Sequence, residues 1–176
     1  MIVQLDDADL PALVAHIARH GAESGNDGDL IFRPRSSAGT ATIDDMATIE
    51  RHKIGWAQPL HEPLWLRTWG VGIGRQIIGH LDLYGGRMPS EAHRCLLGMG
   101  IERDHRGRGH GRGLLEVAIA WARAAGLSWI DLGVFAHNPR ARRLYESVGF
   151  ETVGVVADRY RVDDRSIDDV SMALKL

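Results

Sequence analysis

The segment from Arg106 to Gly113 reads Arg-Gly-Arg-Gly-His-Gly-Arg-Gly, with glycine at every second position. Glycine has no Cβ, so a backbone built in this way can lie directly against a ligand. An apolar run precedes the segment, and an amphipathic stretch from 114 to 125 follows it at once. The unpaired N–H groups at the start of a helix attract anions, and arginine side chains suit phosphate oxygens. The segment therefore predicts a pyrophosphate-binding loop between a strand and a helix.

Two common phosphate-binding patterns do not fit this loop. The dinucleotide pattern Gly-x-Gly-x-x-Gly meets Arg112 when counted from Gly107, and Leu114 when counted from Gly109. A Walker loop needs Gly-Lys-Ser/Thr, and no lysine lies nearby. The pattern that remains is Arg-x-x-Gly-x-Gly. A glycine-rich turn that faces solvent and binds nothing is the alternative interpretation.

Composition limits the class of protein. A chain of 176 residues suits one domain, spanning 1–176, and a formal charge of −2 gives no general attraction to nucleic acid or to a membrane. Cys95 is the only cysteine, which excludes an internal disulfide and fits a reducing compartment. The start of the chain has neither the basic nor the long apolar region of a signal peptide. These features predict a soluble, cytoplasmic protein.

Apolar periodicity and capping residues predict the element order β-α-α-β-β-β-α-β-α-β-β. The expected strands are 2–5, 64–73, 76–84, 92–102, 129–135, 151–161 and 169–176. The expected helices are 10–22, a second from Thr42 or Asp44 to about 57, 114–125, and 139 to about 149, with a long loop over 22–39. This order predicts an α/β fold with a mixed, mostly antiparallel central sheet of about seven strands and flanking helices.

The second half of the chain resembles the GCN5-related N-acetyltransferase (GNAT) family. The resemblance is most specific over 96–154 and rests on the Arg-x-x-Gly-x-Gly loop, Asn138, Ala141, Leu144-Tyr145 and Gly149-Phe150. It implies the acyl-CoA N-acyltransferase fold, in which two central strands splay apart at the cofactor site. It also implies acetyl-CoA as cosubstrate and direct transfer to an amine.

The same resemblance implies a set of cofactor-binding residues. Main-chain groups of two strand residues would pair with the pantetheine arm, the loop would hold the pyrophosphate, and residues of the next helix would contact the rest of the cofactor. The residues are Met99, Ile101, Arg106, Gly107, Arg108, Gly109, His110, Gly111, Arg112, Asn138 and Arg143. Simpler roles remain open for several of them: core packing for Met99 and Ile101, helix capping for Asn138, packing for His110, and a solvated helix face for Arg143.

Two residues are candidates for catalysis. Tyr145 occupies the position of the family's tyrosine, which implies proton donation to the leaving thiolate; its alternative role is packing on the sheet. Related enzymes place a glutamate or histidine at the position aligned with Cys95, so this chain departs from the pattern. His93 lies two residues before Cys95, on the same face of the strand, and is a candidate general base. The alternative is that His93 is an exposed histidine at the end of the strand, without a catalytic role. Glu91 and Glu102 are weaker candidates, and the reaction can also proceed without a dedicated base.

The predicted acceptor is the primary amine of a small molecule. The tail resembles enzymes that acetylate free L-amino acids, and Asp158, Tyr160 and Asp168 are candidates for residues near the ammonium group. A protein N-terminal or lysine acetyltransferase is one alternative, and a non-catalytic acyl-CoA sensor is another. The family resemblance allows a homodimer. His16 and His20 share a helix face without further ligands, so we expect solvent-facing histidines and no metal site.

Overall fold

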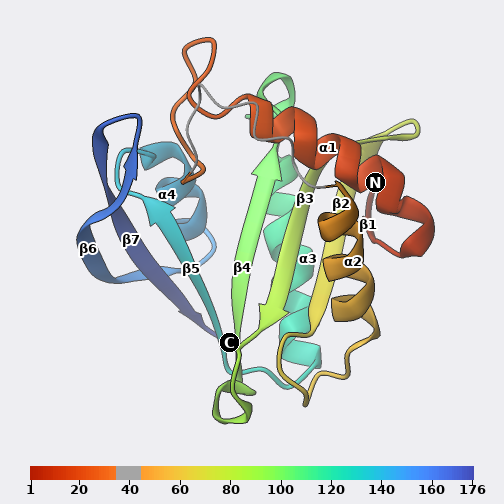
Figure 1. The fold of residues 1–176 in the computed structure, drawn as a ribbon. Coiled ribbons are helices and arrows are strands. Elements are labelled where there is room, and N and C mark those ends of the chain that lie inside the picture. The colour runs from red at the N-terminus through yellow and green to blue at the C-terminus, as the bar shows by residue number, and fades with distance from the viewer. Residues whose placement is uncertain (35–44) are drawn as a thin grey trace.

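A seven-stranded sheet organises the chain in the computed structural model, which describes residues 1–34 and 45–176. The strand order is β1-β2-β3-β4-β5-β7-β6, and every neighbouring pair except β4–β5 is antiparallel. In Figure 1, helices α1 and α2 lie in front of the sheet, and α3 lies behind it. The mixed, mostly antiparallel sheet with flanking helices is confirmed.

The predicted order of elements is also confirmed. The strands are β1 Ile2–Gln4, β2 Leu66–Ile73, β3 Gln76–Gly85, β4 Arg94–Ile101, β5 Trp129–Phe135, β6 Glu151–Val162 and β7 Arg165–Lys175. The helices are α1 Leu10–Ala22, α2 Asp45–Ala57, α3 His110–Ala124 and α4 Pro139–Glu146. The expected starts of the second helix at Thr42 or Asp44 lie outside the described residues.

The predicted start of the third helix was wrong, and the difference changes the structure of the glycine-rich loop. α3 begins at His110 rather than at Leu114, so its first turn is built from the glycine-rich segment itself. The apolar stripe starts only at Leu114, and for this reason periodicity placed the boundary one turn late. Half of the expected loop is therefore the N-terminus of a helix.

The main core lies between the sheet and α3. Leu114, Leu115, Ala118 and Ala122 of α3 are all fully buried in the same cluster as Leu81 and Leu83 of β3 and Cys95 and Leu97 of β4. Because side chains alternate along a strand, Leu96 and Gly98 point to the opposite face of the sheet. The two faces of β4 are thus distinct: one is core, and the other lies on the side of α1 and α2.

β4 and β5 pair over only part of their length. The parallel register joins Arg94 to Trp129, Cys95 to Ile130 and Leu96 to Asp131. β4 continues to Ile101 and β5 to Phe135 with no further pairing between them. The predicted splayed strands are therefore present, and the upper edges of β4 and β5 are open in Figure 1.

The expectation of solvent-facing histidines on α1 was wrong. His16 is fully buried and His20 is 7% exposed. The His16 ring bonds Glu102 through Nδ1 (2.7 Å) and His80 through Nε2 (2.9 Å), while His20 stacks on Phe32. α1 therefore docks on β3 and β4 through a buried polar network. Among the described residues, no group of His, Cys, Asp and Glu is arranged to hold a metal ion.

None of the helices in the described part of the chain has the length and apolar character needed to cross a membrane.

Candidate functional site

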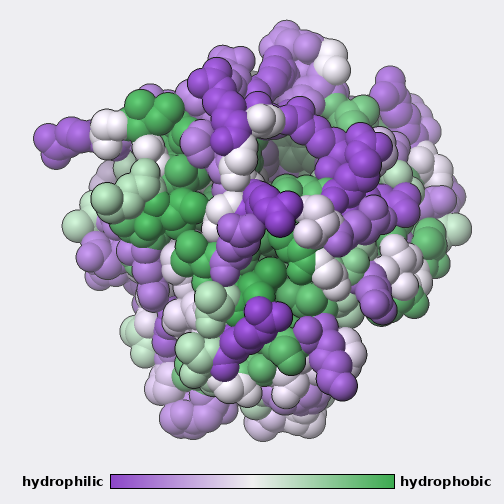
Figure 2. Space-filling view, turned by 180° about the vertical axis from the view of Figure 1, so that it is seen from behind, coloured by the Kyte–Doolittle hydropathy of each residue, from purple (hydrophilic) through white to green (hydrophobic). Residues whose placement is uncertain are grey.

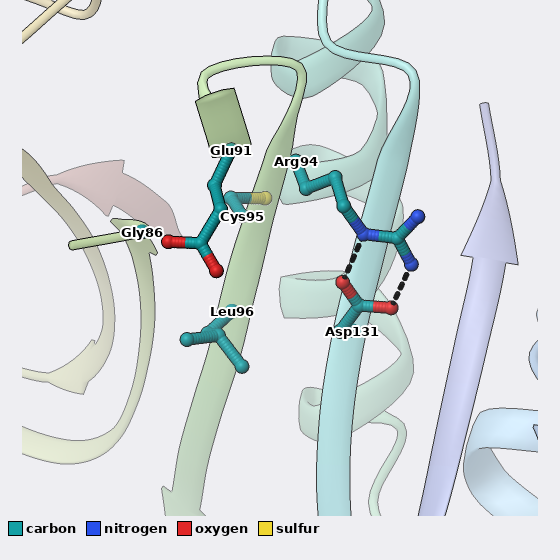
Figure 3. Close-up of a pocket in the computed structure, with 6 residues that line it drawn as sticks. All are labelled: Gly86, Glu91, Arg94, Cys95, Leu96 and Asp131. Carbon is teal, nitrogen blue, oxygen red and sulfur yellow. Dashed lines mark hydrogen bonds and ion pairs between the residues drawn. The ribbon is translucent and has the colours of Figure 1, made fainter. Parts of the chain in front are cut away.

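An ion pair closes the base of the opening between β4 and β5. The Arg94 guanidinium donates two hydrogen bonds to the Asp131 carboxylate, at 2.8 and 2.6 Å, and lies 5.0 Å from the centre of the Trp129 ring. Figure 3 shows this pair beside a small pocket of about 100 Å³ that Gly86, Glu91, Cys95 and Leu96 also line. The pair runs from Arg94 at the first paired step of the two strands to Asp131 at the last, so the opening begins immediately beyond Asp131.

The glycine-rich loop lies at the open end of β4. Gly107 and Gly109 have φ angles of +80° and +83°, in the left-handed region that glycine enters without strain. No side chain caps the first turn of α3. Among the described residues, nothing accepts a hydrogen bond from the backbone N–H of any residue from 107 to 112. This run of N–H groups stands at the positive end of the α3 dipole, an arrangement that favours phosphate.

Arg106, the first arginine of the loop, makes its polar contacts within the protein. Arg106 pairs with the carboxylates of Glu23 and Asp29, and its Nε donates to the carbonyl oxygen of Ile101 at 2.8 Å. Its side chain is only 20% exposed and lies against the Phe32 ring. The structure therefore does not present Arg106 to a phosphate; it ties the loop to the segment after α1.

The other two arginines of the loop point to solvent. Arg112 pairs with Glu116 one turn along α3, and both side chains are more than half exposed. Arg108 is exposed and has no ion pair among the described residues. His110 is partly buried at the first position of α3. Arg108 is thus the loop cation that is available to a ligand.

The N-terminus of α4 borders the same loop. A Cβ placed on Gly107 would lie 3.2 Å from Nη2 of Arg140. Asn138 caps α4, since its Oδ1 accepts a hydrogen bond from the Ala141 N–H at 3.1 Å. Arg143 is exposed on α4. Asn138 therefore has the capping role that the sequence left open, and Arg140 of α4 lies beside the glycine-rich loop.

Met99 and Ile101 lie on the half of β4 that has lost its partner strand. On the other side they pair with Leu81 and Gly79 of β3. Both side chains are partly buried, and a Cβ on Gly111 would lie 3.4 Å from the Met99 methyl group. Main-chain groups at the free edge can pair with an extended ligand. The Ile101 carbonyl already accepts one bond from Arg106, so Met99 is the less committed of the two.

Tyr145 lies on α4, packed against Phe150 with ring centres 5.8 Å apart. The residue is 8% exposed, and burial raises the pKa of its phenol to about 12. Its hydroxyl has no hydrogen-bond partner among the described residues. The hydroxyl oxygen is nevertheless accessible to solvent. The phenol is therefore a protonated donor whose hydroxyl remains accessible.

The structure does not bring His93 to the opening. His93 is exposed in the turn before β4, whereas Met99 and Ile101 lie at the far end of that strand. Cys95 faces the core, and burial raises the pKa of its thiol to about 12. Glu91 accepts bonds from the backbone N–H groups of Arg87 and Met88, so it is also engaged.

The tail residues stabilise the β6–β7 hairpin. Asp158 accepts bonds from Arg161 and from the Ser166 hydroxyl, and these contacts lower the pKa of its carboxyl to about 2. Asp168 accepts the Asp158 N–H at 2.8 Å. Tyr160 packs on Phe135. Two of the three candidates for the acceptor pocket are thus engaged in local polar contacts, and the third packs in a small apolar cluster.

Sequence reasoning missed the segment that follows α1. Ile31 packs with Phe135, Val162 and Ile167, and the His137 ring bonds the Ile31 carbonyl at 2.7 Å. The segment therefore joins α1 to the β5–β7 side of the opening. The acidic residues Glu23 and Asp29 were the only signal in the sequence, and they show no local pattern.

The rear face has a surface consistent with a bound cofactor. Seen from behind, it shows exposed hydrophobic surface and a hollow bordered by hydrophilic side chains (Figure 2). This is the side that carries α3 (Figure 1).

Comparison with known proteins agrees with this geometry. The model of the Acetyltransferase (GNAT) family matches residues 35–150. The chain is 33% identical over 132 residues to the [ribosomal protein bS18]-alanine N-acetyltransferase of Escherichia coli, covering 71% of this chain and 84% of that protein. It is 38% identical over 126 residues to the mycothiol acetyltransferase of Beutenbergia cavernae, covering 72% of this chain and 39% of that protein.

Two further comparisons bear on length and on fold. The N-acetyltransferase YycN of Bacillus subtilis is 31% identical over 92 residues, 52% of this chain and 59% of that protein. The chain thus spans well under two thirds of the length of YycN and of the mycothiol enzyme. A GNAT-superfamily phosphinothricin acetyltransferase from Sinorhizobium meliloti, solved in complex with AcCoA, superposes with a TM-score of 0.80 at 15% identity. That alignment covers 100% of this chain and 88% of that one, and it supports the fold.

Proposed function

Because the chain belongs to the GNAT family of acetyltransferases, we propose that it moves the acetyl group of acetyl-CoA directly to a primary amine of a small molecule. One observation carries the proposal: the unpartnered N–H groups of residues 107–112 stand beside the open edge of β4. A diphosphate and an extended amide-containing arm are the two chemical features that such a site would recognise. Acetyl-CoA has both.

The loop would hold the pyrophosphate. Its N–H groups supply the donors, and Gly107 and Gly109 let the backbone approach the phosphate oxygens closely. Arg108 adds positive charge, Arg140 of α4 lies beside Gly107, and the exposed Arg143 would contact a further phosphate group. The pantetheine arm would follow the free edge of β4, with Met99 as its main-chain partner. A backbone N–H at this edge would also stabilise negative charge on the thioester oxygen.

Tyr145 would protonate the leaving sulfur. The amine nitrogen forms a C–N bond to the thioester carbon, the C–S bond breaks, and the electron pair stays on sulfur as a thiolate. The accessible phenol then donates its proton, and it is replenished by a proton released from nitrogen. Since burial raises the pKa of Tyr145 to about 12, the hydroxyl stays protonated through the neutral range.

Direct transfer fits the nucleophiles present. An acyl-enzyme formed on cysteine would require a reactive thiol, and Cys95 is the only cysteine of the chain. It is 1% exposed, and burial raises the pKa of its thiol to about 12. The thiolate needed for covalent catalysis is therefore disfavoured.

The relatives support two acceptor classes. The mycothiol acetyltransferase similarity supports a small-molecule acceptor, and free L-amino acids remain the favoured group within that class. The similarity to a ribosomal-protein alanine N-acetyltransferase covers most of that enzyme and supports a protein N-terminus as the second candidate. A non-catalytic acyl-CoA sensor remains as the alternative without turnover.

A pooled acceptor assay separates these functions. Purified protein and acetyl-CoA would be incubated with amino acids, polyamines, aminoglycosides and short peptides, one of which begins with alanine. We expect mass spectrometry to show acetylation of a small amine. Acetylation of the alanine peptide alone would assign a protein substrate. Bound and intact acetyl-CoA with every acceptor unchanged would assign the sensor.

The Tyr145→Phe variant tests the proton donor. Phenylalanine keeps the packing on Phe150, so the variant should fold and bind acetyl-CoA as the wild type does. Loss of a general acid should lower kcat by about 100-fold or more with little change in KM for acetyl-CoA. Ser147→Ala is the control, because it removes a hydroxyl at the end of the same helix that donates only to the Leu144 carbonyl oxygen. Equal kcat in both variants would remove Tyr145 from the mechanism.

The remaining expectations from the sequence stay predictions. They are a single domain over 1–176, a cytoplasmic location, and a homodimer that the resemblance allows. Light scattering of the purified protein tests the last of these directly.

A further inference from the structure

Two glycines face each other across the opening between β4 and β5. Gly98 and Gly133 each lie two residues beyond the last paired residues, Leu96 and Asp131. A side chain at either position would therefore lie on the same face of the sheet as the side chains of Leu96 and Asp131, opposite the core face that carries Cys95 and α3. At this level the opening has no side chains of its own on that face.

A polar side chain from the next strand outward lies over each glycine. A Cβ on Gly98 would lie 4.0 Å from Cε1 of Tyr84, which belongs to β3. A Cβ on Gly133 would lie 3.0 and 3.1 Å from the two carboxylate oxygens of Asp169, which belongs to β7. A phenol and a carboxylate thus border the opening from opposite sides. We call these four residues the glycine window.

The carboxylate of the glycine window is uncommitted. Asp131 is engaged by Arg94, and the buried Asp82 accepts the Thr68 hydroxyl at 2.7 Å. In contrast, nothing in the described part of the chain donates a hydrogen bond to Asp169 or forms an ion pair with it. Burial raises the pKa of its carboxyl, and Arg159 opposes the shift from a distance. A carboxylate that has lost water without gaining a partner gains most from a bound cation.

Near the last paired residues, this face of the opening is exposed in the described part of the chain, whereas further along β5 the Phe135 side chain is buried against Ile31 and Tyr160. Leu96 is 41% exposed and Tyr84 is 37% exposed. In Figure 1, α2 lies in front of β2 and β3, and α1 crosses the top of the sheet, so neither helix lies in front of β5. A small molecule can therefore reach the glycine window from the side opposite the phosphate-binding loop.

We propose that the acceptor is a cationic primary amine that enters through the glycine window, where the Asp169 carboxylate binds its ammonium group and the Tyr84 hydroxyl accepts a second hydrogen bond from it. The inference rests on the proposed acetyl transfer and adds the residue that selects the acceptor. The ammonium loses one proton to solvent before the C–N bond forms, and Asp169 remains ionised throughout. Acceptors without positive charge lose this contact.

The Asp169→Asn variant tests the selection directly. A charge-assisted hydrogen bond is worth about 1.5–3 kcal/mol, so KM for an alkylammonium acceptor should rise about 10- to 100-fold. An arylamine, which is uncharged at pH 7.5, should show an unchanged KM. Asp168→Asn is the matched control: it makes the same chemical change one residue away, on an exposed side chain that accepts only the Asp158 N–H. A KM that rises equally for charged and uncharged acceptors, or equally in both variants, would overturn the assignment.

A binding measurement that needs no turnover separates the two proposals. Saturation-transfer NMR would compare benzylammonium with benzyl alcohol as probes, with the protein and CoA present. We expect the wild type and Asp168→Asn to bind benzylammonium preferentially, and Asp169→Asn to lose the preference. This result would support the Asp169 site even if no amine were acetylated. Equal binding of the two probes to the wild type would overturn the site even if acetyl transfer were established.

Discussion

Arg94 and Asp131 join β4 to β5 by two hydrogen bonds, with Arg94 at the first step where these strands pair and Asp131 at the last. Beyond Asp131 the two strands no longer pair, and the free edge of β4 that carries Met99 begins there. The ion pair lies at the paired end of the opening between the two strands. It is also about one third exposed, at 35% for Arg94 and 27% for Asp131, so its geometry matters more than its energy.

Replacing Asp131 by Asn should loosen the base of the opening. Because the pair is partly exposed, the free energy of unfolding should fall by no more than about 1 kcal/mol, a few degrees in Tm. We expect acetyl-CoA affinity, measured by calorimetry, to fall several-fold as β4 and β5 lose their alignment. Arg161→Gln removes a similar pair with Asp158 in the β6–β7 hairpin and should leave affinity unchanged. Similar losses of affinity in both variants would show that the pair has no special role.

Gly109→Ala should weaken cofactor binding. Gly109 has a φ of +83° and nothing lies within 4 Å of an added Cβ, so the cost is backbone strain of about 1 kcal/mol and not a clash. The loop should relieve that strain by moving its N–H groups away from the phosphate positions, which we expect to reduce acetyl-CoA affinity about tenfold.

Gly126→Ala is the control for this variant. Gly126 follows α3 at its other end, has a φ of +78°, and also has open space around it. Its strain should lower Tm to a similar extent without changing cofactor affinity. An affinity loss of the same size at Gly126 would mean that global destabilisation, and not the loop, explains the effect.

Arg106→Gln should destabilise the protein more than a surface charge change does. Arg106, Glu23 and Asp29 are 20%, 18% and 13% exposed, so the change leaves the largely buried Glu23 carboxylate without an ion-pair partner among the described residues, and Asp29 with only the longer pair to Arg103 at 3.3 Å. We expect a loss of about 3 kcal/mol or more in the free energy of unfolding by urea titration. Arg112→Gln breaks an exposed pair one turn apart and should cost less than about 0.5 kcal/mol. Equal midpoints for the two variants would contradict the anchoring role.

The buried histidines should make the fold sensitive to mild acid. Burial lowers the pKa of His20 to about 2 and of His80 to about 4, and it also lowers the pKa of His16. The unfolded chain therefore binds more protons than the folded one below about pH 6.5, so stability falls as pH drops through this range. His20 and His80 each contribute about 2 kcal/mol of this loss between pH 6.5 and pH 5, from 1.36 kcal/mol per pH unit.

A single substitution measures how much one histidine contributes to this loss of stability. His20→Gln should reduce the difference in unfolding free energy between pH 6.5 and pH 5 by about 2 kcal/mol, because one buried titrating group is gone. His61→Gln, at a side chain that is 80% exposed, should leave the difference unchanged. Identical pH dependence in the His20 variant and the wild type would assign the acid sensitivity to other groups.

Local signals predicted most of the fold. Alternating glycines, helix caps and apolar periodicity depend on residues close together in the chain, and they located every α-helix and strand of the described residues in the right order. The start of α3 was late because its first turn, from His110 to Gly113, carries no apolar residue. The burial of His16 and His20 could have been predicted, since both share the apolar face of Leu13 and Ile17.

The site was less predictable because its contacts join distant residues. Glu23 and Asp29 meet Arg106 from about 80 positions away, so the loop motif alone suggested a phosphate ligand where the structure has an internal anchor. His93 directly precedes the strand that carries Met99, and strand period could not tell which end of β4 opens. Asp169 lies over Gly133 only because β7 returns beside β5.

The Arg106 anchor also limits how such a domain can be re-engineered. The segment that carries Glu23 and Asp29 reaches over to Phe135 through Ile31. Grafting a foreign segment here, to alter which acceptors are admitted, would exchange the carboxylates that fix the phosphate-binding turn. A chimera would then lose affinity for its donor while its acceptor was being redesigned. Mutant libraries that vary residues around the acceptor should therefore keep Glu23, Asp29 and Arg106 unchanged together.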